Sequence, residues 1–169
     1  MKGYKQIGRG SFSTAYRKGN SKKVLISSRD DVKECMALGW FPSSRLFPSV
    51  TRLSYSTNGR STYTMKYYDK IKAPKQQLNA KAYKLYRALK KLDIFCLNHH
   101  DLYEECIEKF RTLSNEFRTA KYALIKAVEA LSNYGSDIQF EISPRNIAAT
   151  PSGNLILLDC FFMSSALSS

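Results

Sequence analysis

Short apolar runs separated by polar turns fill the first 68 residues of the chain. Residues 2–18 predict a strand, a glycine turn and a second strand, and residues 22–27 predict a third strand. Two further β-rich runs, 50–56 and 61–68, are separated by Thr-Asn-Gly-Arg, in which Asn58-Gly59 is a strong signal for a hairpin turn. The pattern therefore predicts an antiparallel sheet.

One helix is expected inside this sheet, over residues 28–40. Ser28 or Asp30 provides an N-cap for it. One face of the helix would carry Val32, Cys35, Met36 and Gly39. The two prolines of residues 41–50 predict a loop between this helix and the next strand.

The middle of the chain has helical periodicity. Pro74 favours a helix start, and apolar residues at near-helical spacing continue that helix to residue 92. A long second pattern covers residues 101–135, with Gly135 as its expected C-cap. Residues 136–154 predict mainly loop, except that 146–150 would form a strand paired with a buried strand at 155–162.

Composition places the chain among folded proteins. Its 169 residues, 43% of them hydrophobic, suit one domain or one small two-lobed unit. It contains no apolar run long enough for a membrane helix, and its first residues lack the apolar core of a signal peptide. We therefore expect a soluble, intracellular protein of the cytoplasm, with no membrane partner and with reduced cysteines.

The formal net charge of +13 favours acidic partners, whether nucleotide, nucleic acid or protein. Residues 66–91 hold nine Lys or Arg and one acid, Asp69, which suits either a solvated helix face or an anion-binding face. Cys96, His99, His100 and Cys106 lie close in sequence, but their spacing matches no usual zinc pattern, and packing at a helix end is the preferred interpretation.

Ile-Gly-Arg-Gly-Ser-Phe-Ser-Thr-Ala-Tyr, residues 7–16, carries the strongest chemical signal. A strand–turn–strand with few side chains at Gly8 and Gly10 lets backbone N–H groups approach phosphate oxygens. The segment 8–16 resembles the glycine-rich loop of protein kinases, with Ser13 in the place of the third glycine.

A second match lies near the end of the chain. Residues 141–146, Glu-Ile-Ser-Pro-Arg-Asn, resemble the kinase catalytic loop, and residues 157–161, Leu-Leu-Asp-Cys-Phe, resemble the strand and metal-binding segment that follow it. The resemblance implies that Asn146 and Asp159 hold Mg²⁺ and that Glu141 acts as catalytic base. Arg145 would assist with the transferring phosphate.

The resemblance implies an α+β, protein kinase-like fold that uses ATP and Mg²⁺. A small antiparallel sheet lobe with one helix would span residues 1–68, and a truncated, mostly helical lobe would span 69–169 and end in a catalytic-loop-like hairpin. Its nucleotide-binding residues would be Gly8, Gly10, Ser11, Ser13, Lys23, Met65 and Tyr67. The chain is most similar to the early protein kinases of podoviruses, so the likeness implies a phage protein that acts on a host protein during host takeover or counter-defence.

Several residues depart from the kinase pattern. Ser27 stands where a kinase places the lysine that grips the phosphates, with Lys22 and Lys23 earlier on the same strand. Glu34 could match the acid that pairs with that lysine. Glu141 replaces the usual catalytic aspartate, and a longer side chain shifts the position of the base. Only ten residues follow Asp159, so a kinase-type substrate-holding segment is not expected.

Three functional hypotheses follow. In the first, preferred because of these departures, the chain is a pseudokinase that inhibits a host protein and can bind ATP. In the second, it is a minimal serine/threonine protein kinase acting on host proteins. In the third, it is a basic nucleic-acid-binding protein, whose lysines contact phosphates while the tyrosines among them stack on bases. Those tyrosines are Tyr63, Tyr67, Tyr68, Tyr83 and Tyr86.

Overall fold

An antiparallel sheet occupies one end of the molecule. The structure, a computed structural model, describes residues 3–55, 59–92 and 102–164. Its five-stranded sheet has the order β1-β2-β3-β5-β4. The strands are β1 (Tyr4–Arg9), β2 (Ser13–Lys18), β3 (Lys23–Ser28), β4 (Val50–Ser54) and β5 (Ser61–Lys66). The predicted sheet is confirmed, while Asn58 of the predicted hairpin turn lies outside the described residues.

Helix α1 (Asp31–Ala37) packs on one face of this sheet. Between the two sequence candidates for its N-cap, the structure selects Asp30, whose side chain accepts the Val32 N–H at 2.9 Å. Val32, Cys35 and Met36 are buried as expected. Gly39 instead lies beyond the helix with a φ of 77°.

The helical part has more breaks than the periodicity predicted. The single helix expected from Pro74 is two, α2 (Pro74–Gln77) and α3 (Ala80–Lys91), because Leu78 is extended and Asn79 caps a new helix by accepting the Ala82 N–H. The long pattern from residue 101 likewise divides at a new cap. It forms α4 (Leu102–Arg111), a short 3-10 helix, η1 (Asn115–Phe117), and α5 (Arg118–Leu131).

The prediction of Gly135 as the cap of the last helix is wrong. Helix α5 ends at Leu131 with Ser132 as its C-cap, and Gly135 lies in the turns that follow. The apolar face of α5 nevertheless packs as the periodicity predicted, with Leu124, Val128 and Leu131 fully buried.

Four short strands complete the chain. The predicted hairpin is confirmed as β7 (Ile147–Ala149) paired with β8 (Leu155–Leu157). The segment before it was predicted as loop, but it contains β6 (Ile138–Phe140), which pairs with β9 (Phe161–Met163). Rings of Phe140 and Phe161 pack 5.1 Å apart, and this contact continues through Phe110 and Phe47.

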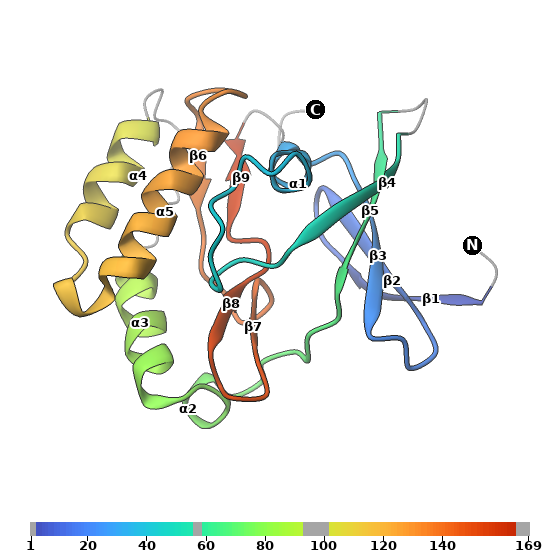
Figure 1. Ribbon diagram of the computed structural model, residues 1–169, viewed down its shortest axis with the longest axis horizontal. Helices are drawn as coiled ribbons and strands as arrows, with labels where there is room; N and C mark the ends of the chain where they lie inside the picture. The colour runs from blue at the N-terminus through green and yellow to red at the C-terminus, as the bar shows by residue number, and fades with distance from the viewer. Residues whose placement is uncertain (1–2, 56–58, 93–101, 165–169) are drawn as a thin grey trace.

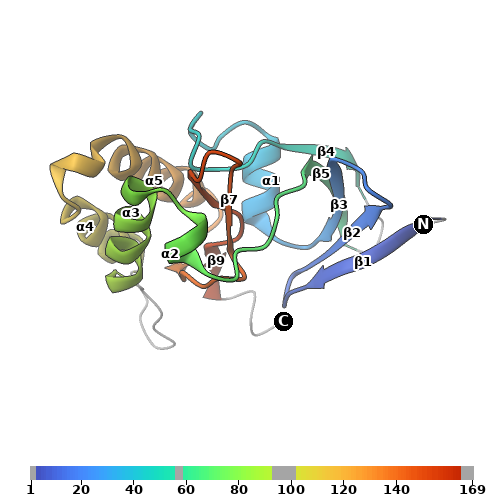
Figure 2. The ribbon, with the colours of Figure 1, turned by 90° about the horizontal axis from the view of Figure 1, so that it is seen from below.

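Helix α1 and the short strands lie between the two larger parts. Figure 1 shows the sheet and the helices α3, α4 and α5 at opposite ends, and Figure 2 shows α1 between them. One cluster of buried side chains runs from the sheet through α1 to α5. The α+β class with an antiparallel N-terminal sheet is therefore confirmed. The division at residue 68 stays a prediction.

The described helices include none that combines the length and the apolar character needed to cross a membrane.

The turn between β7 and β8 gives a stability prediction. Gly153 has a φ of 75°, and a Cβ there would lie 2.7 Å from the backbone nitrogen of Asn79. Gly19 also has a positive φ, but nothing lies within 4 Å of its Cβ position. Urea unfolding should show a loss of about 1 kcal/mol for Gly19→Ala from backbone strain alone, and about 3 kcal/mol for Gly153→Ala from strain plus overpacking. Equal losses would contradict the close packing of this turn on α3.

Candidate functional site

The glycine turn between β1 and β2 is held by its own backbone. Gly10 N–H donates to the Ser13 carbonyl at 2.8 Å, and the Phe12 carbonyl accepts the Arg29 N–H at 3.2 Å. Neither Gly8 nor Gly10 has a positive φ, and a Cβ on Gly10 would meet its nearest atom at 3.9 Å. These glycines therefore keep the turn free of side chains rather than permit a special backbone conformation.

A pair of serines fills the end of the sheet beneath this turn. Val24, Ile26 and Ser28 alternate as the buried positions of β3. Ser28 therefore faces the core, whereas Ser27, which the resemblance places at the kinase lysine position, does not. The Ser28 hydroxyl lies 2.6 Å from that of Ser13. The Ser13 hydroxyl is therefore hydrogen-bonded within the sheet, and its contact with a nucleotide stays a prediction.

Lys33, on α1, supplies a cation that the sequence analysis missed. Its Nζ lies 2.7 Å from Asp159 Oδ1, 3.1 Å from the Leu158 carbonyl oxygen and 3.7 Å from Asp30 Oδ2. The Lys33 side chain is 3% exposed, whereas that of Asp159 is 41% exposed. A buried ammonium thus joins α1 to the segment that was predicted to bind metal.

Burial and neighbouring charge oppose each other in this cluster. Burial by itself lowers the pKa of Lys33, but the carboxylates of Asp159 and Asp30 raise it above its ordinary value, so the ammonium stays charged. Burial raises the pKa of Asp30 to about 6, against the lowering effect of Lys33. Burial therefore shifts the protonation of Asp30 toward neutral pH.

Two segments from the kinase resemblance lie side by side. The Asn146 carbonyl accepts the N–H groups of Leu158 at 2.8 Å and of Asp159 at 3.3 Å. Glu141 N–H donates to the Cys160 carbonyl at 2.9 Å. The structure thus brings Glu141, Asn146 and Asp159 into one region, although their predicted roles in catalysis and metal binding remain predictions.

The donor set at Asp159 does not form a ready site for Mg²⁺. One carboxylate oxygen is bound by the Lys33 ammonium, a cation that a divalent metal would have to displace. Over the described ranges 3–55, 59–92 and 102–164, no group of three His, Cys, Asp or Glu side chains could hold a metal ion. Asp159 is thus paired with Lys33, and the Mg²⁺ contacts that the resemblance implies for Asn146 and Asp159 stay predictions.

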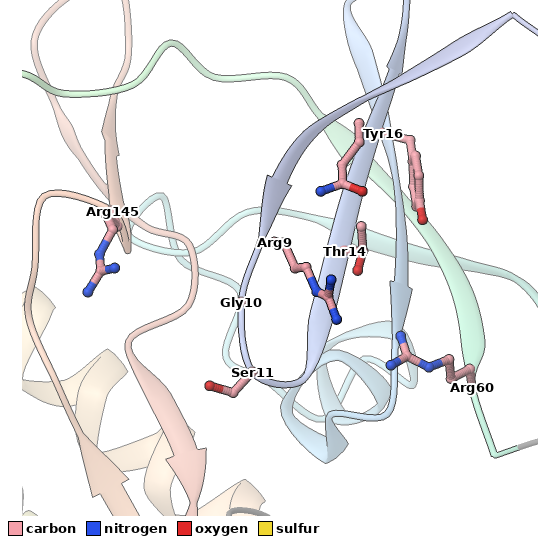
Figure 3. Close-up of a pocket in the computed structure, with 8 residues that line it drawn as sticks. Arg9, Gly10, Ser11, Thr14, Tyr16, Arg60 and Arg145 are labelled. Atoms are coloured by element: carbon pink, nitrogen blue, oxygen red, sulfur yellow. The ribbon is translucent and has the colours of Figure 1, made fainter.

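An arginine-lined cavity of about 690 Å³ lies beside the glycine turn. Figure 3 shows Arg9 and Arg60 at the sheet, and Arg145 on the loop before β7, to the other side of Gly10 and Ser11. Gln6, Thr14 and Tyr16 complete the lining. Three guanidinium groups without a lining carboxylate favour a ligand that carries several negative charges.

This cavity, which we call the arginine cavity, opens on the outer side of the β1–β2 hairpin. Thr14 pairs with Ser27 and Tyr16 with Leu25, so their side chains lie on the face opposite Ile26 and α1. Neither Lys33 nor Asp159 lines the arginine cavity, although its Arg145 adjoins Asn146, whose carbonyl accepts the Asp159 N–H. Among the predicted nucleotide-binding and catalytic residues, Gly10, Ser11 and Arg145 line the cavity.

Three of the predicted nucleotide contacts, Lys23, Met65 and Tyr67, lie at the other end of the sheet. Lys23 is exposed and pairs with Lys66. It is the first residue of β3, and Ser28, which lies under the glycine turn, is the last. Tyr67 donates its N–H to the Lys22 carbonyl at 2.8 Å, and its ring packs under the Arg17 guanidinium. The structure does not bring Lys23, Met65 and Tyr67 to Gly10, and their contact with an adenine stays a prediction.

Glu34, the predicted partner of a lysine, and two of the tyrosines predicted to stack on bases have structural roles instead. Glu34 forms an ion pair with Arg52 and accepts the Tyr63 hydroxyl at 2.8 Å, so it does not pair with a lysine. Tyr63 is 2% exposed and Tyr86 9% exposed. Because a base cannot stack on a buried ring, the proposed stacking role of these two tyrosines in nucleic-acid binding is wrong.

The cysteines of the described residues are buried and unpaired with each other. Cys35, Cys106 and Cys160 are free thiols, and burial raises the pKa of Cys106 to about 12, so it is not poised as a thiolate ligand. Cys96, His99 and His100 lie outside the described residues.

Lys33, Asp30, Arg9 and Arg60 were missed by the sequence analysis. Asp30 had been assigned only as a cap, and Lys33 follows a buried valine in a segment rich in charge, so no local signal marks it as buried. Arg9 lies inside the glycine-rich segment itself, where an arginine between two glycines could have been recognised as a phosphate contact.

Comparisons with known proteins give a distant structural likeness only. No protein-family model matches the chain, and no curated protein is similar to it in sequence. Among solved structures, the chain is similar to a spectinomycin phosphotransferase in complex with ADP and spectinomycin, with 12% sequence identity and a TM-score of 0.42. The match covers 96% of this chain and 65% of the phosphotransferase. A likeness this weak carries no argument for function.

The Lys33–Asp159 pair gives a second stability prediction. Lys33→Met leaves Asp30 buried without its cation, so it should cost about 3–5 kcal/mol of unfolding free energy. In a double-mutant cycle, Lys33→Met and Asp159→Asn should couple by about 1–3 kcal/mol. The exposed pair Lys109–Glu105, 2.8 Å apart, is the matched control and should couple by less than about 1 kcal/mol. Equal coupling in both pairs would contradict the buried connection.

The raised pKa of Asp30 predicts how the stability of the fold depends on pH. Its folded pKa of about 6 exceeds the ordinary value of 3.8, so the folded state holds the proton more tightly than the unfolded state. The contribution of this group to stability is thus fully present below about pH 4 and decreases as the pH rises through about 6. Measured from pH 4 to 7, the stability of the wild type relative to Asp30→Asn should fall. A constant difference would show that Asp30 does not titrate in this range.

Proposed function

We propose that this chain is a kinase-like binding protein, a pseudokinase, that binds a nucleoside triphosphate without transferring the γ-phosphate. The observation that carries the proposal is the ion pair between Lys33 and Asp159. The carboxylate that the kinase resemblance assigns to Mg²⁺ is neutralised by a buried ammonium, 2.7 Å away. Phosphoryl transfer depends on metal ions that neutralise developing charge, so this substitution favours binding without transfer.

The arginine cavity supplies the binding half of the proposal. Arg9, Arg60 and Arg145 would neutralise the phosphates, and the hydroxyls of Ser11 and Thr14 would donate hydrogen bonds to them. These groups would hold the phosphates beside the glycine turn, in a cavity that neither Lys33 nor Asp159 lines. Because protein cations neutralise the phosphates there, binding should need no divalent metal.

The resemblance to the early kinases of podoviruses makes a host protein the expected partner of this module, in host takeover or counter-defence. Binding to that partner would then produce the biological effect. Nucleotide would stabilise the module, and its role would be separate from any phosphate transfer.

One observation favours the alternative, an active serine/threonine kinase. Glu141, Asn146 and Asp159 are held together by backbone hydrogen bonds, as a catalytic centre would require. The Ser143 hydroxyl oxygen is buried without a hydrogen-bond partner among the described residues, which leaves a donor for a ligand. In this case Lys33 would leave Asp159 when nucleotide and metal bind.

Thermal unfolding with ATP in EDTA tests the binding half. Gly10→Asp places a carboxylate in the arginine cavity without a backbone clash, because its Cβ has room. ATP at 100 times its Kd should stabilise the wild type by about 2.7 kcal/mol, and Gly10→Asp should lose this stabilisation. Gly19→Asp, in the β2–β3 turn, is the matched control and should keep it. Stabilisation retained by Gly10→Asp would refute binding at this turn.

Incubation with γ-labelled ATP, Mg²⁺ and a bacterial lysate tests the absence of transfer. The wild type should label no more protein than Asp159→Ala does. Label that requires Asp159 would establish the alternative kinase activity instead.

A further inference from the structure

A second cavity, of about 1050 Å³, lies on the helical part and is unused by the proposed nucleotide site. Its walls come from the loop of residues 38–47, from α3, from η1 and α5, and from the turn between β7 and β8. We call it the α3–α5 groove. None of the residues that line the arginine cavity lines this groove, so the two sites are distinct.

The walls of the groove are fixed by hydrogen bonds. Leu157 N–H donates to the Leu46 carbonyl at 2.8 Å, which fastens the loop to β8. Asn79, at the start of α3, donates its N–H to the Gly153 carbonyl and its side-chain amide to Asn154 Oδ1. A groove built this way is formed before a ligand arrives, so little conformational entropy is lost on binding.

The lining has an apolar floor and two exposed rings. Leu46, Leu85, Phe117 and Leu155 belong to the buried core and form the floor. Trp40 is 51% exposed and Tyr122 63% exposed, two of the five large hydrophobic side chains that the described residues expose. Trp, Tyr and Arg are the residues that most often anchor protein interfaces.

The charges around the groove are mainly positive. Arg45, Lys81 and Lys126 line it together with one acid, Glu116, whose carboxylate lies 3.7 Å from Lys84 Nζ. Lys126 forms an ion pair with Glu129 at 2.5 Å, so Arg45 and Lys81 carry most of the positive charge. The exposed face of α3 continues this positive charge through Lys84 and Arg87. A partner that covers the floor would therefore gain from acidic residues at its edges.

We propose that the α3–α5 groove binds an acidic peptide segment of a partner protein, with an aromatic or aliphatic side chain on the apolar floor. The open question about the basic segment 66–91 is thereby answered in favour of protein. Nucleic acid would follow the exposed lysines and leave the apolar floor uncovered, since the tyrosines Tyr83 and Tyr86 pack on each other rather than face a base. This proposal does not depend on nucleotide binding.

Trp40 is the only tryptophan of the chain and lines the groove, so its fluorescence reports on binding there. Random linear peptides without tryptophan are displayed and selected on the whole protein, with single-stranded oligothymidylate present as competitor. Enriched peptides are then synthesised and titrated while the emission of Trp40 is recorded. We expect acidic peptides with an apolar anchor, and a shift of the Trp40 emission to shorter wavelength as the ring is covered.

Charge reversal locates the binding. Arg45→Glu with Lys81→Glu changes two exposed residues of the groove and should weaken peptide binding at least about tenfold. Lys5→Glu with Lys22→Glu makes the same change in net charge on the exposed sheet and should leave binding within about twofold. Ala120→Glu, which places a carboxylate in the groove itself, should also weaken it.

Three outcomes would overturn the proposal. The first is that no peptide is enriched over the Arg45→Glu/Lys81→Glu protein, or that the enriched peptides lack acidic residues. The second is that both double variants lose affinity equally, which would indicate net charge alone. The third is that oligothymidylate displaces the peptide and itself shifts the Trp40 emission, which would assign the groove to nucleic acid.

Discussion

The ion pair between Lys33 and Asp159 connects the two parts of this molecule. It joins α1, which packs on the sheet, to the segment between β8 and β9, across 126 residues of sequence. Taking the ammonium out of water has a large desolvation cost, which is offset because two carboxylates and the Leu158 carbonyl surround it. Removing any partner would leave a buried charge uncompensated, so this arrangement fixes the orientation of α1.

The same pair determines the chemistry available at the site. With Lys33 on one oxygen of Asp159, the segment that resembles a metal-binding kinase motif becomes a structural connection. Ser27 stands at the position where a phosphate-gripping lysine was expected, and the neighbouring Ser28 is hydrogen-bonded to Ser13. Positive charge for a ligand is instead provided by arginines on the other side of the glycine turn. These features support the proposal of a protein that binds, with one surface for nucleotide and another for a partner.

Local signals in the sequence were sufficient for much of the fold. The sheet strands, the cap of α1 and the β7–β8 hairpin were predictable because each depends on neighbouring residues. The breaks at Asn79 and Ser114 were not, because the apolar spacing continues across them and conceals the caps. Strand β6 was missed because it is three residues long and pairs with β9, far along the chain. Lys33 was missed for the same reason, since its burial depends on Asp159.

Paramagnetic broadening by Mn²⁺ tests most directly whether Lys33 takes the place of a metal. Amide spectra of the wild type and of Lys33→Met would be recorded during titration with Mn²⁺ and ATP. The account predicts that the Asp159 and Cys160 amides of the wild type keep their intensity, while those of a folded Lys33→Met protein broaden, since an unpaired carboxylate can accept the metal. Broadening of the wild-type amides at low Mn²⁺ would show that Lys33 does not exclude metal, and would contradict the account.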